Sequence, residues 1–245
     1  MNLFLLPEQV AQVQWPANDA RAHHLKKVLH AQDGDLIDFG VVNGPRGKGS
    51  VQWEKSGGVN LFLKWKEPHP GDLLPVSLLV GLSRPQTCRK VIEQASTLGV
   101  SELIFFRAEK SEASYTESSL WDEEWHRLLI KGAEQAFSCH LPHYKKVNSL
   151  EIAIQSSSFS TNLLALDVYE ASQALSEAGQ PNNKNTLLAV GPERGWSQSE
   201  RELLREQEFT LCHMGQRVLR VETAVVASLG YLSANYWPDR GWTGE

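Results

Sequence analysis

The sequence predicts an α/β protein in two parts, and three observations support this. Residues 1–72 show short strands and turns at close spacing, which is typical of a small barrel. From residue 73 onward apolar strands alternate with amphipathic helices, which is typical of a parallel sheet covered by helices. The proline-rich break Glu67-Pro68-His69-Pro70-Gly71-Asp72 separates the two patterns. We therefore expect domains at 1–72 and 73–245.

In the first part, strands are expected where apolar and polar residues alternate, over Leu36–Val42, Gly49–Trp53 and Val59–Lys66. A helix is expected over Arg21–Leu29, with Leu25, Val28 and Leu29 on one face. Asn43–Gly49 is expected to be a glycine-rich basic hairpin loop.

In the second part, short apolar runs predict buried strands at Val76–Val80, Leu103–Phe106, Leu163–Leu166, Leu187–Val190 and Phe209–Met214. Helical periodicity predicts helices over Gln86–Leu98 and Glu123–Phe137. Two connections are expected to be irregular, a polar loop at Gln155–Ser160 and a flexible link at Gly179–Asn185.

The run Leu187–Val190 ends at Gly191-Pro192, a pair that stops regular structure. Ser197 precedes Glu200 by three residues, the spacing of a capping box at a helix start. Glu193, Arg194 and Gly195 therefore belong to a loop between a strand and a helix.

A second glycine loop follows Phe209–Met214, where Gly215 begins the connection to a helix with Ala224, Ala227, Ser228 and Tyr231 on one side. In open α/β sheets, loops at the carboxyl ends of strands bind ligands. The alternative is that both loops are ordinary connections whose glycines only turn the chain. Neither has the spacing of a known phosphate-binding loop.

The composition excludes several classes of protein. The chain has no apolar run long enough for a membrane span, and its first residues do not resemble a secretory signal. Three cysteines without C-x-x-C spacing fit a reducing compartment, so a cytoplasmic protein is expected. Cys139-His140 and Cys212-His213 are neighbours in sequence, a poor arrangement for binding one ion, and no metal is expected.

The segments GPERGWSQSE (Gly191–Glu200) and MGQRVLRVETA (Met214–Ala224) together resemble the signature of the RsmE-type 16S ribosomal RNA (uracil-N3)-methyltransferases. These enzymes belong to the SPOUT superfamily, which uses S-adenosylmethionine (SAM). Weaker matches follow in the family's order and extend over nearly the whole chain: His24-Leu25, Val28-Leu29, Gly34-Asp35, Leu98-Gly99-Val100, Glu134-Gln135 and Pro142.

The resemblance implies a PUA-like RNA-binding barrel over 1–72 and a SPOUT α/β domain with a trefoil knot over 73–245, working as a homodimer. It implies a cofactor site on three loops, the first after the strand that ends at Leu166. The implied SAM-binding residues are Leu166, Gly191, Glu193, Gly195, Met214, Gly215, Val218, Leu219 and Thr223. The implied substrate is 16S rRNA or the small ribosomal subunit.

A net charge of −5 argues against binding RNA by bulk electrostatics, so any bound RNA must be held by local patches of basic residues. The candidates for phosphate contacts are Arg21, Lys26, Lys27, Arg46 and Lys48. For the 43–49 loop, a solvated turn is the competing interpretation.

N3 of uracil lies on the pairing edge, so the base must be unpaired before methylation. Arg220 is the candidate for stabilising the negative uracil oxygen, because guanidinium stays charged and offers several donors. Glu222 either orients Arg220, accepts a proton, or only complements the helix dipole.

The chain departs from the family pattern mainly at basic positions. Arg194 stands where a second glycine is usual, Thr97 where a glutamate is usual, and His30, Lys110 and Ser138 where arginines are usual. Two alternatives follow: a related SPOUT enzyme that modifies another RNA base, and a non-catalytic RNA-binding or ribosome-assembly protein whose SAM pocket is filled by Arg194.

Overall fold

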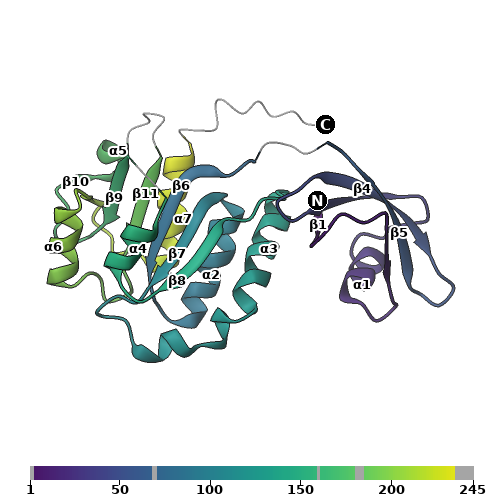
Figure 1. The fold of residues 1–245 in the computed structure, drawn as a ribbon, viewed down its shortest axis with the longest axis horizontal. Helices are drawn as coiled ribbons and strands as arrows, with labels where there is room; N and C mark the ends of the chain where they lie inside the picture. The colour runs from purple at the N-terminus through teal and green to yellow at the C-terminus, as the bar shows by residue number, and fades with distance from the viewer. Residues whose placement is uncertain (1–2, 68–70, 159–160, 180–184, 235–245) are drawn as a thin grey trace. The chain divides into compact units, whose positions relative to one another are not determined.

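The computed structural model describes residues 3–67, 71–158, 161–179 and 185–234 (Figure 1). These residues belong to two compact units. The first unit comprises Met1–Asp72 and Ala133–Leu141, and the second comprises Leu73–Gly132 and Pro142–Glu245. The segment Ala133–Leu141 joins the first unit in addition to the residues that sequence analysis assigned to it.

The first unit is a mixed five-stranded sheet in the order β1-β3-β4-β5-β2, with one helix. Its elements are β1 (Leu3–Leu6), β2 (Gln12–Trp15), α1 (Ala20–Lys27), β3 (Leu36–Val41), β4 (Arg46–Trp53) and β5 (Val59–Trp65). Strand β1 runs parallel to β3, and the other pairs are antiparallel. Phe4, Trp15, Leu25, Phe39 and Leu61 lie in its core.

The expected basic loop at Asn43–Gly49 is wrong over most of its length, because β4 already begins at Arg46. Gly47 and Gly49 are buried strand residues, and a Cβ on them would lie 2.6 Å from the Lys64 carbonyl oxygen and 2.7 Å from Phe39 Cε2. The glycines therefore permit close packing and do not form the turn. Arg46 and Lys48 project from the exposed side of β4.

The second unit contains a seven-stranded, fully parallel sheet in the order β10-β12-β9-β11-β6-β7-β8, which confirms the predicted parallel sheet. Its strands are β6 (Leu74–Gly81), β7 (Val100–Phe106), β8 (His143–Val147), β9 (Asn162–Leu166), β10 (Gln173–Ala174), β11 (Thr186–Val190) and β12 (Thr210–His213). Its helices are α2 (Pro85–Thr97), α3 (Glu124–Ala136), α4 (Leu150–Ser156), α5 (Leu175–Ala178), α6 (Gln198–Glu206) and α7 (Val221–Ser233), and the last turn of α3 belongs to the first unit.

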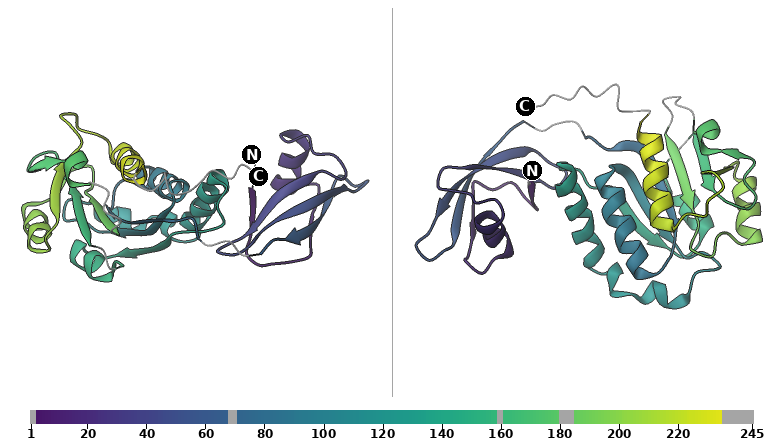
Figure 2. Two further views of the ribbon diagram at one scale, coloured as in Figure 1. Left: turned by 90° about the horizontal axis from the view of Figure 1, so that it is seen from above. Right: turned by 180° about the vertical axis from the view of Figure 1, so that it is seen from behind.

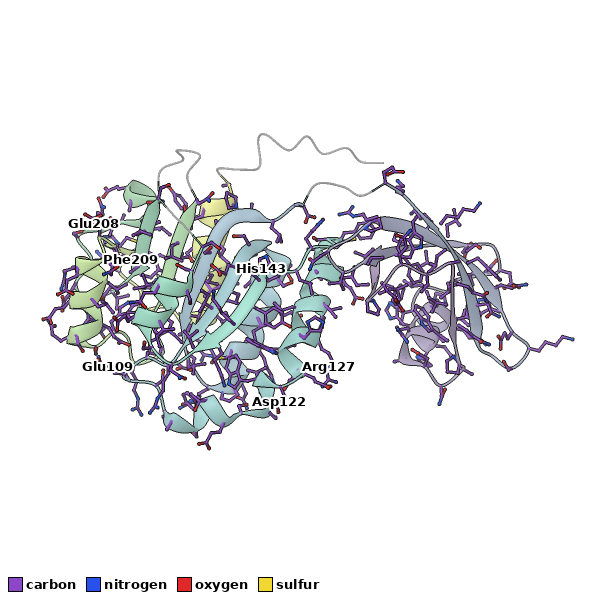
Figure 3. The ribbon with its side chains drawn as sticks, in the orientation of Figure 1. Glu109, Asp122, Arg127, His143, Glu208 and Phe209 are labelled. Atoms are coloured by element: carbon purple, nitrogen blue, oxygen red, sulfur yellow. The ribbon has the colours of Figure 1, made fainter. Side chains whose placement is uncertain are left out.

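Helices cover both faces of this sheet. Figure 2 shows α7, α2 and α3 side by side on one face, and α4 lies on the opposite face in Figure 1. Side chains of β6, β7 and β11 are buried nearly throughout, since helices lie above and below them. Figure 3 labels Glu208 and Phe209 at the turn between α6 and β12, where Glu208 has a φ of 60° and Phe209 is buried.

The second unit also contains short elements that the sequence pattern did not predict, among them α4. Gln155 and Ser156 end this helix, so the expected polar loop at Gln155–Ser160 is wrong at its start, and residues 159–160 lie outside the described residues. Ser149 caps the helix by accepting a hydrogen bond from the Ile152 amide. Most of the expected link Gly179–Asn185 also lies outside the described residues. No described helix is both long and apolar enough to span a membrane.

Candidate functional site

The carboxyl ends of four neighbouring strands form one row in the second unit. In the sheet register Leu166 of β9 is level with Val190 of β11 and with Cys212 of β12, and Val190 is level with Val80 of β6. The loops that follow these strands therefore leave the sheet at the same edge. Since the strand order also reverses beside β6, this edge is where ligands bind in open α/β sheets.

A cavity of about 770 Å³ lies at this edge. Its walls come from the loops that follow β6, β9, β11 and β12, from the first turns of α2 and α7, and from residues between Lys110 and Tyr115. The volume lies within the range of small-molecule and cofactor sites. The two predicted glycine loops thus belong to one site, together with the loop after Leu166.

An ion pair and two hydrogen bonds hold the loop after β9 in place. Asp167 is buried and forms an ion pair with Arg201 of α6, whose side chain is also buried. Asp167 Oδ1 accepts a hydrogen bond of 2.7 Å from the Tyr169 amide. The carbonyl oxygen of Leu166 accepts a hydrogen bond of 2.8 Å from Trp196 Nε1, which ties this loop to the next one.

The loop after β11 contains Gly191 and Gly195, each required for a different reason. A Cβ on Gly191 would lie 3.1 Å from the Trp196 ring, whereas Gly195 has a φ of +66°, in the left-handed region that favours glycine. The loop ends at the predicted capping box, which the structure confirms: Ser197 Oγ accepts from the Glu200 amide, and Glu200 Oε2 accepts from the Ser197 amide.

Glu193 links this loop to the start of α2. Its Oε1 accepts a hydrogen bond of 3.0 Å from the backbone amide of Arg84. Arg84 is the N-cap residue of α2, and its own side chain makes no capping hydrogen bond. Glu193 thus satisfies the backbone amide of the N-cap residue, as the glutamate of a capping box does.

The loop after β12 turns at Gly215, which has a φ of +93° and donates its amide to His213 Nδ1 at 3.1 Å. Arg220 is the N-cap residue of α7, its side chain is exposed, and no acidic group among the described residues pairs with it. Glu222 lies in the first turn of α7 and its Oε1 accepts a hydrogen bond of 3.1 Å from Lys90 Nζ.

The Glu222 carboxyl is ionised at neutral pH. Burial acts to raise its pKa, but this effect is outweighed by the hydrogen bonds from its own backbone amide and from Lys90, and by the charges of Lys90 and Arg220. The net result is a pKa below the ordinary value of a glutamate. Such a carboxylate is a weaker proton acceptor than an ordinary one.

Most of the sequence-predicted cofactor and catalytic residues line this one cavity: Leu166, Gly191, Glu193, Gly195, Met214, Val218, Leu219, Arg220 and Glu222. Gly215 and Thr223 are exposed and do not line it. Sequence reasoning missed Arg84, Lys90, Asp167 and Tyr169, which the fold brings to the cavity from other segments. For Asp167 the only available signal was its position directly after a buried strand.

Arg194 lines the cavity without filling it. Its side chain is 69% exposed and its Nη2 lies 3.5 Å from Glu112 Oε1. Lys110 also lines the cavity and donates to the Trp196 carbonyl oxygen at 2.6 Å. Ser138, in the first unit, is buried and donates to Asp72 Oδ1 at 2.7 Å. This departure from the family pattern thus has a structural partner within its own unit.

The five candidate RNA-binding cations lie on α1 and β4 of the first unit. Acidic neighbours offset the positive charge of three of them. The ion pairs are Arg21 with Asp19 at 2.7 Å, Arg46 with Asp72 at 3.6 Å, and Lys48 with Asp38 at 2.6 Å. Lys26 Nζ lies 5.4 Å from the centre of the Trp53 ring. Lys27 is exposed and has no acidic partner among the described residues.

Within the described part of the chain, no three His, Cys, Asp or Glu side chains come together as a metal site. Burial raises the pKa of Cys88 and of Cys212 to about 12, so both thiols remain protonated at neutral pH. Cys212 lies at the cavity wall as a neutral, weakly polar group.

Comparison with known proteins gives a consistent set of relatives. Residues 70–233 match the family of RNA methyltransferase domains. The chain is 30% identical to Ribosomal RNA small subunit methyltransferase E 1 of Borreliella burgdorferi over 234 residues, which are 93% of this chain and 95% of the relative. It is 26% identical to Ribosomal RNA small subunit methyltransferase E of Bacillus subtilis over 223 residues, 86% of each chain.

Solved structures share the fold. The crystal structure of a Ribosomal RNA small subunit methyltransferase E from Neisseria gonorrhoeae, bound to S-adenosyl methionine, superposes with a TM-score of 0.77 at 20% identity, covering 96% of this chain and 97% of the other. A predicted RNA methyltransferase from Thermotoga maritima superposes with a TM-score of 0.68 at 26% identity, covering 97% and 99%.

Proposed function

The chain belongs to the family of ribosomal RNA small subunit methyltransferases E, and from this membership we propose that it transfers the methyl group of SAM to N3 of a uridine in the 16S rRNA of the small subunit. The observation that supports this most is the convergence of three strand-end loops on one cavity that holds nearly all the residues expected to bind the cofactor and to act in catalysis.

The cavity fits SAM in size and in chemistry. Its walls combine apolar side chains, such as Leu166 and Leu219, with glycines whose backbone groups a nucleoside can approach closely. Cavity carboxylates, such as Glu193, suit the cationic end of an amino acid. When bound, SAM supplies an electrophilic methyl group on a positively charged sulfur.

The chain's own residues then favour loss of the N3 proton, which passes to solvent water at the open rim of the cavity. Negative charge develops on the uracil oxygens as this proton leaves, and a preorganised cation beside them lowers the barrier. Arg220 is exposed, forms no ion pair among the described residues and lies at the rim of the cavity, so we assign this role to it. Because Glu222 has a lowered pKa and holds Lys90, we assign it to orienting the cations and not to removing the proton.

The finer features expected from the family remain part of this proposal. A PUA-like RNA-binding domain over 1–72 is supported by the mixed sheet of the first unit, where Lys26, Lys27 and Lys48 are exposed. A trefoil knot in a SPOUT domain over 73–245 is supported by the path of the last part of the chain. Strand β12 lies beyond β9 in the sheet order, and the chain then returns to α7, which packs against α2 and β11.

A homodimer, which the family resemblance implies, belongs to the same proposal, and Val226 on α7 is a large apolar residue open to solvent. The chemistry proposed for the site requires SAM and ribosomal RNA, both of which are available in the cytoplasm, and we place the protein there. The non-catalytic alternative, with Arg194 filling the pocket, is disfavoured because Arg194 extends into solvent and the cavity is retained.

Two measurements test the proposed function. Calorimetry is expected to show one SAM bound per chain, and small subunits from a strain lacking the protein are expected to gain N3-methyluridine when incubated with the protein and SAM. Absence of SAM binding would favour the non-catalytic alternative. Methylation of a different base would favour the related SPOUT enzyme.

A further inference from the structure

We propose that Tyr169 is a stacking platform on which the target base of the RNA rests at the mouth of the cavity. This inference rests on the proposed function and extends it to a residue outside the two sequence signatures. Tyr169 lies in the loop after β9, lines the cavity and is 75% exposed. An aromatic ring so exposed contributes little to folding, so its position calls for another explanation.

Tyr169 is one of three exposed apolar residues around this opening. Val168, from the same loop, is 47% exposed, and Val218, from the loop after β12, is 76% exposed, and both also line the cavity. Single exposed apolar side chains are common, but a group of them at the rim of a cavity indicates a binding surface.

The ring of Tyr169 stands on a rigid base. The Tyr169 amide donates to Asp167 Oδ1, and the Asp167 carboxylate is held by the buried Arg201. The Arg201 guanidinium carbon lies 5.8 Å from the centre of the Tyr169 ring. On the side of the next loop, a Cβ on Gly195 would lie 3.9 Å from Tyr169 Cε2. The ring is therefore placed before any ligand arrives, which lowers the entropy cost of binding.

A nucleobase from RNA fits this rim better than the adenine of the cofactor. Small-molecule sites enclose most of their ligand, and the enclosed walls of this cavity are buried residues such as Val190 and Trp196. Tyr169 is open to solvent instead. A base drawn out of its stack is held between aromatic and apolar side chains, and Tyr169 and Val218 provide both kinds.

The charges around the rim are those needed to hold an RNA backbone. Arg84, Arg217 and Arg220 line the same cavity, and none of their guanidinium groups forms an ion pair with a carboxylate among the described residues. An aromatic ring combined with unpaired cations is the arrangement by which proteins bind single-stranded nucleic acid. We therefore assign the surface formed by Tyr169, Val168 and Val218 to the unstacked uridine, and Arg84 and Arg217 to its flanking phosphates.

The test compares Tyr169→Ala with Tyr169→Phe in the full-length protein, using small subunits that lack the modification. Tyr169→Ala is expected to raise the KM for subunits about tenfold, a loss of about 1.4 kcal/mol, and to weaken equilibrium binding to subunits without SAM by a similar factor. SAM affinity is expected to change less than about twofold. Tyr169→Phe retains the ring and is expected to behave like the wild type.

Ile152→Ala is the matched control, because Ile152 is another exposed apolar residue and does not line the cavity. An unchanged KM and unchanged subunit binding in Tyr169→Ala would overturn the proposal. So would a loss of SAM affinity with normal subunit binding, since the ring would then belong to the cofactor site. A wild-type protein that neither binds SAM nor methylates subunits would instead overturn the proposed function.

Discussion

The carboxylate of Asp167 and the guanidinium of Arg201 form an ion pair beneath the loop that follows β9, with side chains only 1% and 9% exposed. A pair so buried has lost its hydration, and it is stable only while both partners are present. Here it also fixes the turn at Tyr169, because Asp167 Oδ1 accepts the Tyr169 amide. The pair therefore connects the stability of the second unit to the shape of the cavity.

Removing Arg201 alone should strongly destabilise the protein. Arg201→Met leaves the Asp167 carboxylate buried without a charged partner, and the expected loss is about 3–5 kcal/mol in the free energy of unfolding, measured by urea titration. The double variant Asp167→Asn with Arg201→Met removes both charges and keeps an oxygen that accepts the Tyr169 amide. It is expected to recover more than half of the loss. A loss below about 1 kcal/mol in the single variant would contradict a desolvated pair.

Replacing Glu193 should affect α2 and the cavity together. Glu193→Ala removes the acceptor for the Arg84 amide at the start of α2, and the expected destabilisation is about 1 kcal/mol, the usual effect of losing a cap. SAM affinity in calorimetry is expected to fall as well, while Glu193→Gln keeps an acceptor and most of the stability. Glu206→Ala, an exposed carboxylate that does not line the cavity, is the control. Equal stability of the Ala variant and the wild type would rule out the capping role.

The parts of the fold that could be predicted from sequence are those with local signals. Apolar runs marked the central strands, the Ser197 to Glu200 spacing marked a capping box, and both are confirmed. The resemblance to the methyltransferase family is also confirmed. Convergence of the loops after Val190 and His213 followed from the rule for carboxyl ends in parallel sheets, whereas the loop after Leu166 was expected only from the family resemblance.

The parts that could not be predicted depend on partners distant in sequence. Arg201 lies 34 residues after Asp167, and no periodicity links the two. The amide of Leu5 donates to Glu134, which is 129 residues away, and this contact helps to hold Ala133–Leu141 in the first unit. The glycines of β4 were misassigned to a turn because glycine serves close packing and turns equally well.

Arg220 should be required for the chemical step. Arg220→Ala is expected to lower kcat for subunit methylation at least about 100-fold, the usual effect of losing one group that stabilises a developing oxyanion. The fold should remain intact, because the side chain is exposed and only the backbone of Arg220 takes part in the α7 hydrogen bonds. Arg220→Lys keeps the charge without the planar fork of donors and should recover only part of the rate. Near-normal turnover of Arg220→Ala, with unchanged melting temperature, would reject this role.

Glu134 should make the first unit less stable as the pH rises. Burial raises the pKa of its carboxyl, and this outweighs the hydrogen bond from the Leu5 amide and the charge of Arg21, which both lower the pKa. Below the ordinary pKa of 4.5 the group is protonated in the folded and the unfolded chain, and burial of a neutral carboxyl is not penalised. As the pH rises through the raised pKa of the folded state, the partly buried group ionises and stability is lost.

Glu134→Gln tests this pH dependence without removing the hydrogen bond, since the amide oxygen of glutamine also accepts the Leu5 amide. The variant is expected to gain stability relative to the wild type as the pH rises from about 4.5 towards 8, measured by urea unfolding at each pH. Carboxylates with a lowered pKa, such as Asp19 and Glu222, make the folded protein more stable as the pH rises. They are present in both the variant and the wild type, so their effect cancels in the difference between the two free energies of unfolding. Glu206→Gln, an exposed control, should show no such trend. A difference between Glu134→Gln and wild type that is the same at every pH would mean that the pKa of Glu134 is not raised in the folded protein.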